Sequence, residues 1–242
     1  MTRFLASVRS AAEAELVLAA GADIIDLKEP NAGALGAVAP SVVRECLKAI
    51  GGRKPVSATV GDLPMEPDGV VDAVVATAKL GVHTVKVGVL AGGNPKGCFE
   101  ALRALTLPAE LVLVFFADAL PDMDPVDAAR ASGARGVMLD TAGKGGASLI
   151  DHLPIREIER FVDEARRAGL QSGLAGSLRA RHVGPLLALQ PDVMGFRGAL
   201  CRRGVRDLSL DPVACAEIGQ LMATGRCALE ARFEARAAAT MC

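Results

Sequence analysis

The stretch IIDLKEPNAGALGA, residues 24–37, runs from four apolar-rich residues straight into a lysine and a loop with proline and glycine. A short apolar run that ends at such a loop is typical of a buried β-strand. The same unit recurs along the whole chain, each time followed by an Ala-rich segment. Strands are expected at residues 4–8, 24–28, 55–60, 84–90, 111–118, 136–141, 170–177 and 193–200.

The segments between these runs have the pattern of amphipathic helices, for example AAEAELVLAA (11–20) and PIREIERFVDEARRAGL (154–170). Several end in Ala-Gly or Ser-Gly, and glycine is common just past a helix C-terminus. Strands that alternate with helices predict a parallel sheet. Eight βα units in 242 residues predict one closed (β/α)8 barrel, an α/β fold. No linker divides the chain, so we expect a single domain over 1–242 with a helical tail at about 211–242.

An open doubly wound sheet is the competing fold. It would need a G-x-G-x-x-G turn after the first strand, and SVRSAAEAE (7–15) contains none. The segment TAGKGG (141–146) also fails the phosphate-binding P-loop pattern, because Met138 stands at its first glycine and Gly145 replaces its Ser/Thr. These absences argue against nucleotide binding.

Composition excludes several further classes of function. The formal net charge is -1, aromatics are 3% of the residues, and Trp and Tyr are absent, so neither a basic surface nor stacking platforms for nucleic acid are expected. No segment has the length and apolarity of a membrane span or signal peptide, which predicts a cytoplasmic protein. The six cysteines and three histidines show no ligand spacing, which predicts reduced thiols and no metal site.

Ionisable residues stand at the ends of five predicted strands: Lys28, Lys86, Asp118, Asp140 and Arg197. Active sites of such barrels lie at the C-terminal ends of the strands. All except Asp118 belong to even-numbered strands, and side chains from alternate strands share one layer of a barrel. We therefore expect these four to converge.

Asp26 precedes Lys28 by two residues, so it faces the same way about 6–7 Å lower. A lysine among carboxylates and beside a second lysine can be a tuned amine, since a neighbouring cation and an apolar wall both lower a lysine pKa. The simpler interpretation of each lysine is a solvated residue at the barrel rim. Asp118 and Arg197 could equally cap helices or pair with neighbours.

Two glycine-bearing turns follow the last two strands, GLAGSL (173–178) and FRGALC (196–201). In many barrels these loops hold a phosphate through backbone amides. They predict a phosphorylated substrate, with Gly176, Ser177, Arg197 and Gly198 as its binding residues. Lys144 follows Asp140 by four residues on a loop that is either a lid or simply solvated.

Three motifs together carry a resemblance to a known family. They are D-x-K-x-P-x-x-G-x-L-G-A (26–37), V-K-V-G (85–88) and L-D-T-x-x-K-x-G (139–146). The sequence resembles (5-formylfuran-3-yl)methyl phosphate synthase, also called 4-(hydroxymethyl)-2-furancarboxaldehyde-phosphate synthase, over its whole length. The resemblance implies a TIM barrel that condenses two molecules of glyceraldehyde 3-phosphate and loses phosphate and water. The product feeds methanofuran in archaea and an analogue in methylotrophic bacteria.

The resemblance also implies residue roles. Lys28 would form a Schiff base with the substrate and Lys86 would accept a proton, with Asp140 and Lys144 as further active-site residues. Asp26 joins these candidate catalytic residues because it shares a strand face with Lys28. No cofactor or metal is implied. The sequence departs from archaeal members at Glu29, where Asn is expected, which bears on loop packing and not on the chemistry.

Two other functions fit the same residues. A class I Schiff-base aldolase acting on another sugar phosphate would share both lysines and both phosphate loops, and only its product would differ. A non-catalytic barrel that binds a phosphosugar is the third possibility, although it gives no reason for both lysines and Asp140. The partner in every case is a small phosphorylated molecule, and a homo-oligomer is compatible with the sequence.

Overall fold

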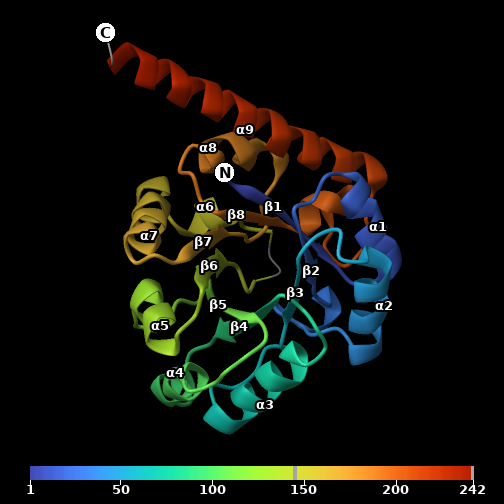
Figure 1. Ribbon diagram of the computed structural model, residues 1–242, viewed down its shortest axis with the longest axis vertical. Helices are drawn as coiled ribbons and strands as arrows, with labels where there is room; N and C mark the ends of the chain where they lie inside the picture. The colour runs from blue at the N-terminus through green and yellow to red at the C-terminus, as the bar shows by residue number, and fades with distance from the viewer. Residues whose placement is uncertain (144–145, 241–242) are drawn as a thin grey trace.

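The structure, a computed structural model, describes residues 1–143 and 146–240. Eight parallel strands close into a barrel in the order of the sequence, surrounded by helices (Figure 1). The strands are β1 (Arg3–Val8), β2 (Ile24–Leu27), β3 (Val56–Thr59), β4 (Thr84–Val89), β5 (Glu110–Phe116), β6 (Gly136–Asp140), β7 (Gln171–Leu174) and β8 (Val193–Phe196). The predicted (β/α)8 barrel is confirmed.

Helices follow the strands and pack on the outside of the barrel. They are α1 (Ala11–Ala19), α2 (Pro40–Ile50), α3 (Pro67–Ala78), α4 (Pro95–Arg103), α5 (Pro125–Ser132), α6 (Leu149–His152), α7 (Ile155–Arg167), α8 (Ala180–Leu187) and α9 (Pro212–Thr240), with the 3-10 turns η1 (Pro30–Ala32), η2 (Gly198–Leu200) and η3 (Arg202–Gly204). Helices α2 to α5 begin with proline, whose fixed φ suits the first helical position. At α5, Asp124 accepts from two backbone amides and the left-handed Gly133 follows the last turn, so both ends are capped.

The strand register separates two apolar layers. Inside the barrel, Leu5, Val114 and Met138 pack in one cluster, while a larger cluster lies between the strands and the helices. Ser7 on β1 is level with Asp26 on β2, which is level with Ser57 on β3. Residues in register point to the same side of a sheet, so these three polar groups share the barrel interior.

Three predicted strand ends were too late by two or more residues. Strands β7 and β8 end at Leu174 and Phe196, whereas the sequence predicted 177 and 200. After β7 the backbone enters the left-handed region at Gly176 (φ 97°) and Ser177 (φ 47°), which ends strand geometry. Asp118 likewise lies beyond β5, which ends at Phe116.

The loop after β2 folds back over the barrel mouth. Gly33 adopts φ 128°, and a Cβ there would lie 2.0 Å from Oδ2 of Asp62, whose carboxylate accepts from the amides of Ala34 (2.7 Å) and Leu35 (2.8 Å). Leu35 is fully buried in the inner cluster. Its Cδ1 lies 2.9 Å from where Gly88 of β4 would carry a Cβ. The glycines of this loop therefore allow it to cover one side of the mouth and leave the other side open.

Helix α9 confirms the predicted helical tail over residues 212–240 and packs against α1, α8 and η2. Figure 1 shows it running along the outside of the barrel, from beside α1 past α8, and projecting beyond α8 to the C-terminus. Arg226 on this helix pairs with Asp23, Nη1 to Oδ2 2.5 Å, and donates to the carbonyl of Thr2 at 3.3 Å. In the part of the chain that the structure describes, no helix combines the length and apolarity needed to cross a membrane.

Candidate active site

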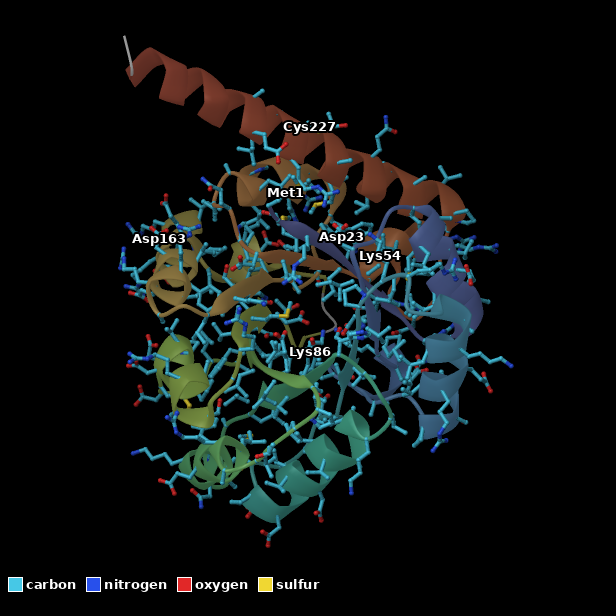
Figure 2. The ribbon with its side chains drawn as sticks, in the orientation of Figure 1. Met1, Asp23, Lys54, Lys86, Asp163 and Cys227 are labelled. Carbon is cyan, nitrogen blue, oxygen red and sulfur yellow. The ribbon has the colours of Figure 1, made fainter. Side chains whose placement is uncertain are left out.

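A cavity of about 360 Å³ opens at the C-terminal ends of the strands. Every predicted site residue within the described part of the chain lines it: Asp26, Lys28, Lys86, Asp140, Gly176, Ser177, Arg197 and Gly198. Lys144 lies outside the described residues. In Figure 2 the label of Lys86 stands at the centre of the ring of strands. The geometry therefore brings together residues that the sequence spreads over 173 positions, from 26 to 198.

Lys86 and Asp26 form a buried ion pair at the base of this cavity. The Nζ of Lys86 lies 2.6 Å from Oδ1 of Asp26, with 4% of Lys86 and 0% of Asp26 exposed. The hydroxyls of Ser7 (2.8 Å) and Ser57 (2.7 Å) donate to the two oxygens of the same carboxylate. A buried carboxylate with a cation and two donors is held ionised and fixed in place.

Burial and neighbouring charges act on both members of this pair. Burial lowers the pKa of Lys86 and Lys28 lowers it further, although Asp26 acts in the opposite direction. Burial raises the pKa of Asp26, but the ammonium groups of Lys86 and Lys28 outweigh it, so this pKa lies below its usual value. Lys86 is thus an amine whose neutral form is more accessible than that of an ordinary lysine.

Lys28 stands directly after β2, and its backbone amide continues the ladder to Val8 at 3.0 Å. Its Nζ contacts Oδ2 of Asp140 at 3.4 Å, and 7% of the residue is exposed. The other oxygen of Asp140 accepts from the amide of Thr141 at 2.8 Å. The contact to Asp140 is long for an ion-paired hydrogen bond, so the amine is held loosely beside the cavity.

In the turn after β7, Gly176 and Ser177 have successive positive φ angles, and both residues line the cavity. Gly198 begins η2, in the turn that follows β8. Within the described residues, the amides of Gly176, Ser177 and Gly198 donate to no acceptor. Amides arranged in this way form an anion-binding concavity.

The side chain of Arg197 is used differently from the sequence expectation of a phosphate donor. Its Nη1 lies 2.5 Å from Oε2 of Glu13, and the pair is buried. The same guanidinium donates to the carbonyls of Ser7 (3.2 Å), Arg206 (3.0 Å) and Leu208 (3.2 Å). Arg197 therefore braces β1 and the loop before α9, which matches the alternative that it pairs with neighbours.

Glu13 was missed by the sequence analysis. It lies in the first turn of α1, where an acidic residue is ordinarily explained by the helix dipole. Its Oε2 also accepts from the amide of Arg9 at 2.9 Å. Nothing in the local sequence distinguishes it from a solvated glutamate, because its partner is 184 residues away.

Among the described residues, Asp118 neither caps a helix nor forms a hydrogen bond or ion pair with a side chain. Its carboxylate accepts from the amides of Ala142 (2.8 Å) and Gly143 (2.6 Å), in the loop that leads to Lys144. Partial burial raises the pKa of Asp118, but these two amides outweigh it and the pKa is lowered. Asp118 therefore holds the start of the β6–α6 loop.

A second cavity, of about 640 Å³, opens at the N-terminal end of the barrel. Leu5, Lys86 and Met138 line both cavities. The side chain of Lys86 therefore borders the cavity at the C-terminal end of the barrel and the cavity at its N-terminal end. His83 lies at this lower end, where its Nδ1 accepts from the amide of Val56 at 3.1 Å. His83 thus joins the residue before β4 to the start of β3.

The remaining candidate groups contribute no chemistry to the cavity. The described cysteines carry free thiols, and burial raises the pKa of Cys46 and of Cys215 to about 11. No cluster of three His, Cys, Asp or Glu side chains within residues 1–143 and 146–240 has the geometry of a metal site. In the deep part of the cavity, the described side chains offer two amines and two carboxylates.

Solved structures with this fold include 3-hexulose-6-phosphate synthase, 20% identical with a TM-score of 0.63, covering 91% of this chain and 100% of that one. Phosphoribosyl anthranilate isomerase from Thermus thermophilus is 17% identical with a TM-score of 0.64, covering 92% of this chain and 99% of the other. At these identities the likeness concerns the fold alone.

Curated relatives are much closer in sequence. The (5-formylfuran-3-yl)methyl phosphate synthase of Methanopyrus kandleri is 37% identical over 217 residues, 85% of this chain and 92% of its own. That of Archaeoglobus fulgidus is 36% identical over 214 residues, 82% of this chain and 90% of its own. A protein of Methylorubrum extorquens is 38% identical over 223 residues, 92% of each chain.

The family model described as 4-HFC-P synthase matches residues 4–219, from the first strand of the barrel into α9. The match spans every strand and every described residue of the cavity. The chain therefore belongs to the 4-HFC-P synthase family, whose curated members are named (5-formylfuran-3-yl)methyl phosphate synthases.

Proposed function

We propose that the chain condenses two molecules of glyceraldehyde 3-phosphate to (5-formylfuran-3-yl)methyl phosphate through a Schiff base on Lys28. The observation that carries the proposal is the convergence of Lys28 and Lys86 in one cavity, each beside its own carboxylate. Family membership supports the synthase activity. The product would serve the biosynthesis of methanofuran or an analogue.

The first step is attack of the neutral Lys28 amine on a triose phosphate carbonyl, with loss of water to form an imine. The protonated imine withdraws electrons from the adjacent carbon, so a proton there can be removed to give an enamine. Lys86 is the proposed proton acceptor, because its pKa is lowered and its amine lines the same cavity. Asp26 holds the ammonium that results.

The enamine carbon then attacks the aldehyde of the second triose phosphate and forms the new carbon–carbon bond. Ring closure by a hydroxyl oxygen displaces the Lys28 amine and regenerates the enzyme. Loss of phosphate and water from the condensed intermediate completes the aromatic ring. In total, the two substrates lose one phosphoric acid and two waters, which balances the atoms of the furan product. Asp140 is the proposed partner for proton exchange with the nitrogen on Lys28, which its 3.4 Å contact supports.

The amides of Gly176, Ser177 and Gly198 are proposed to hold one substrate phosphate. They line the cavity and donate to no acceptor among the described residues, which supports the assignment. The Arg197 guanidinium is not included, since its donors are directed at Glu13 and backbone carbonyls.

The test is incubation with glyceraldehyde 3-phosphate and borohydride, followed by peptide mapping. Wild type and Lys86→Arg should gain a covalent adduct at residue 28, and Lys28→Arg should gain none because a guanidinium stays protonated. An adduct at Lys86 would reverse the two roles. An active wild type without any adduct would remove the Schiff-base mechanism.

Product analysis separates the proposal from a class I aldolase. Mass spectrometry after incubation with glyceraldehyde 3-phosphate alone should reveal a furan phosphate and free phosphate in equal amounts. A sugar bisphosphate that retains both phosphates would instead identify an aldolase. Binding without turnover would identify a phosphosugar-binding barrel.

A further inference from the structure

The proposed condensation brings two phosphate dianions into one cavity, whereas the amides after β7 and β8 form one anion site. If the proposed function holds, on which this inference rests, a second anion site lies within reach of the same lysines. The side chain that stands out is Arg206, in the loop between η3 and α9, which lines the cavity.

The guanidinium of Arg206 lines the cavity and is only partly satisfied by protein acceptors. Its Nε is buried and has no hydrogen-bond partner among the described residues. The carboxylate of Asp207 lies 3.9 Å from this nitrogen, which is too far for a hydrogen bond. A guanidinium that lines the cavity and donates to one backbone carbonyl keeps further donors that an anionic ligand can accept from.

The other end of the same guanidinium is already fixed. Its Nη2 donates to the carbonyl of Gly33 at 3.0 Å, which ties the loop before α9 to the loop that follows Lys28. The side chain therefore reaches across the mouth toward the β2 side, while the turn at Gly176 and Ser177 belongs to the β7 side. The two groups of anion donors come from different edges of the cavity.

The backbone around Arg206 is held by the buried pair of Arg197 and Glu13. The Nε of Arg197 donates to the carbonyl of Arg206 and its Nη2 to that of Leu208. A third arginine, Arg9, donates to the carbonyl of Asp207 at 3.2 Å. The loop is thus anchored at three successive residues, so the Arg206 side chain starts from a fixed position and loses little entropy on binding.

Cations outnumber carboxylates in the cavity lining: two lysines and three arginines stand against Asp26, Asp140 and Asp207 among the described residues. The carboxylates deeper in the cavity, Asp26 and Asp140, face Lys86 and Lys28. At the rim Arg179 also lines the cavity, with Nη1 donating to the carbonyl of Gly204 at 2.9 Å. We propose that Arg206 binds the phosphate of the second triose phosphate, on the side of the mouth next to Lys28, while the amides of the β7 and β8 turns bind the first.

The decisive variant is Arg206→Gln, and Arg202→Gln is its matched control, because Arg202 is exposed on the same loop and does not line the cavity. Calorimetric titration with inorganic phosphate should give two ions per chain for wild type and Arg202→Gln, and one for Arg206→Gln. This readout requires no turnover, so it stands even if the furan product is never formed.

Kinetics give an independent measure. Losing one hydrogen bond to a charged group should raise KM for glyceraldehyde 3-phosphate in Arg206→Gln by roughly tenfold to hundredfold. Arg206→Lys should recover part of the loss as a point charge. The borohydride adduct at Lys28 should persist in Arg206→Gln, because the first substrate still binds. Two phosphates bound to Arg206→Gln, or an unchanged KM, would overturn the assignment, whereas absence of the adduct in wild type would count against the proposed function instead.

Discussion

The ammonium of Lys86 lies 2.6 Å from the carboxylate of Asp26, and both side chains are withdrawn from solvent between two cavities. Removing one member of a buried ion pair leaves the other charge without compensation, at a cost of about 3–5 kcal/mol. We expect Lys86→Met to lower the free energy of unfolding by about that amount, measured by urea denaturation. The double variant Lys86→Met/Asp26→Asn should lose less than the two single variants added together. Additive losses would contradict a direct interaction.

The pH dependence of kcat should report Lys86. A proton acceptor must be neutral, so kcat should rise with pH through the pKa of Lys86, which burial lowers from the ordinary value of 10.5. Asp26 raises this pKa, so Asp26→Asn should move the rising limb to lower pH even though the maximal rate falls. Glu159→Gln, an exposed change on α7, is the control and should leave the limb in place. If the rising limb of the kcat–pH profile stays at the same pH or moves to higher pH in Asp26→Asn, Lys86 is not the group whose titration is observed.

Asp118 should matter through the loop it holds. In Asp118→Ala the amides of Ala142 and Gly143 lose their acceptors, so their hydrogen exchange should accelerate and activity should fall roughly tenfold, as expected for loss of one to two charged hydrogen bonds. Asp122→Ala, an exposed neighbour, is the matched control. The pKa of Asp118 is lowered in the folded state. Its hydrogen bonds to the two amides should therefore keep their full strength above the ordinary pKa of 3.8 and weaken as the pH falls through the lowered pKa. Unchanged exchange at both amides would show that the contact does not order the loop.

Gly36 should tolerate no side chain. A Cβ there would lie 2.3 Å from the carbonyl oxygen of Glu29, so Gly36→Ala must displace the loop that covers the mouth. We expect a loss of about 1–3 kcal/mol in the free energy of unfolding, typical of overpacking, together with reduced activity. Gly69→Ala in α3 meets nothing within 4 Å and should instead stabilise by about 0.4–1 kcal/mol. If Gly36→Ala and Gly69→Ala change the free energy of unfolding equally, steric crowding does not explain the glycine at position 36.

The barrel and the deep part of the site could be predicted because they depend on local patterns. Apolar runs of strand length and the glycines after helices indicate each βα unit, and the two-residue period places Asp26 and Lys28 on one face. The parity of the strands then brings Lys28, Lys86 and Asp140 together without any knowledge of long-range contacts.

The rim of the site could not be predicted in the same way. Ser177 and Gly176 are compatible with a strand until their positive φ angles are seen, so the end of β7 was placed too late. Arg197 follows β8 where a phosphate ligand would stand, and only the fold shows that Glu13 occupies its guanidinium. Arg206 lies in an irregular loop without a motif, and its unused Nε is a property of three-dimensional packing.

Arg226 joins α9 to the carbonyl of Thr2 and to Asp23, contacts that span 224 and 203 residues of sequence. Strand β1 likewise lacks its neighbour β8 until residues 193–196 have been made. A nascent chain therefore exposes one unpaired edge of β1 through most of synthesis, and an unpaired edge is a template for misassembly. Contacts between residues so far apart in sequence also slow folding. The chain loses the entropy of closing a long loop before the contact can stabilise it. We expect protection of the β1 and α9 amides to arise together and last during refolding, and pulsed hydrogen exchange would show this order.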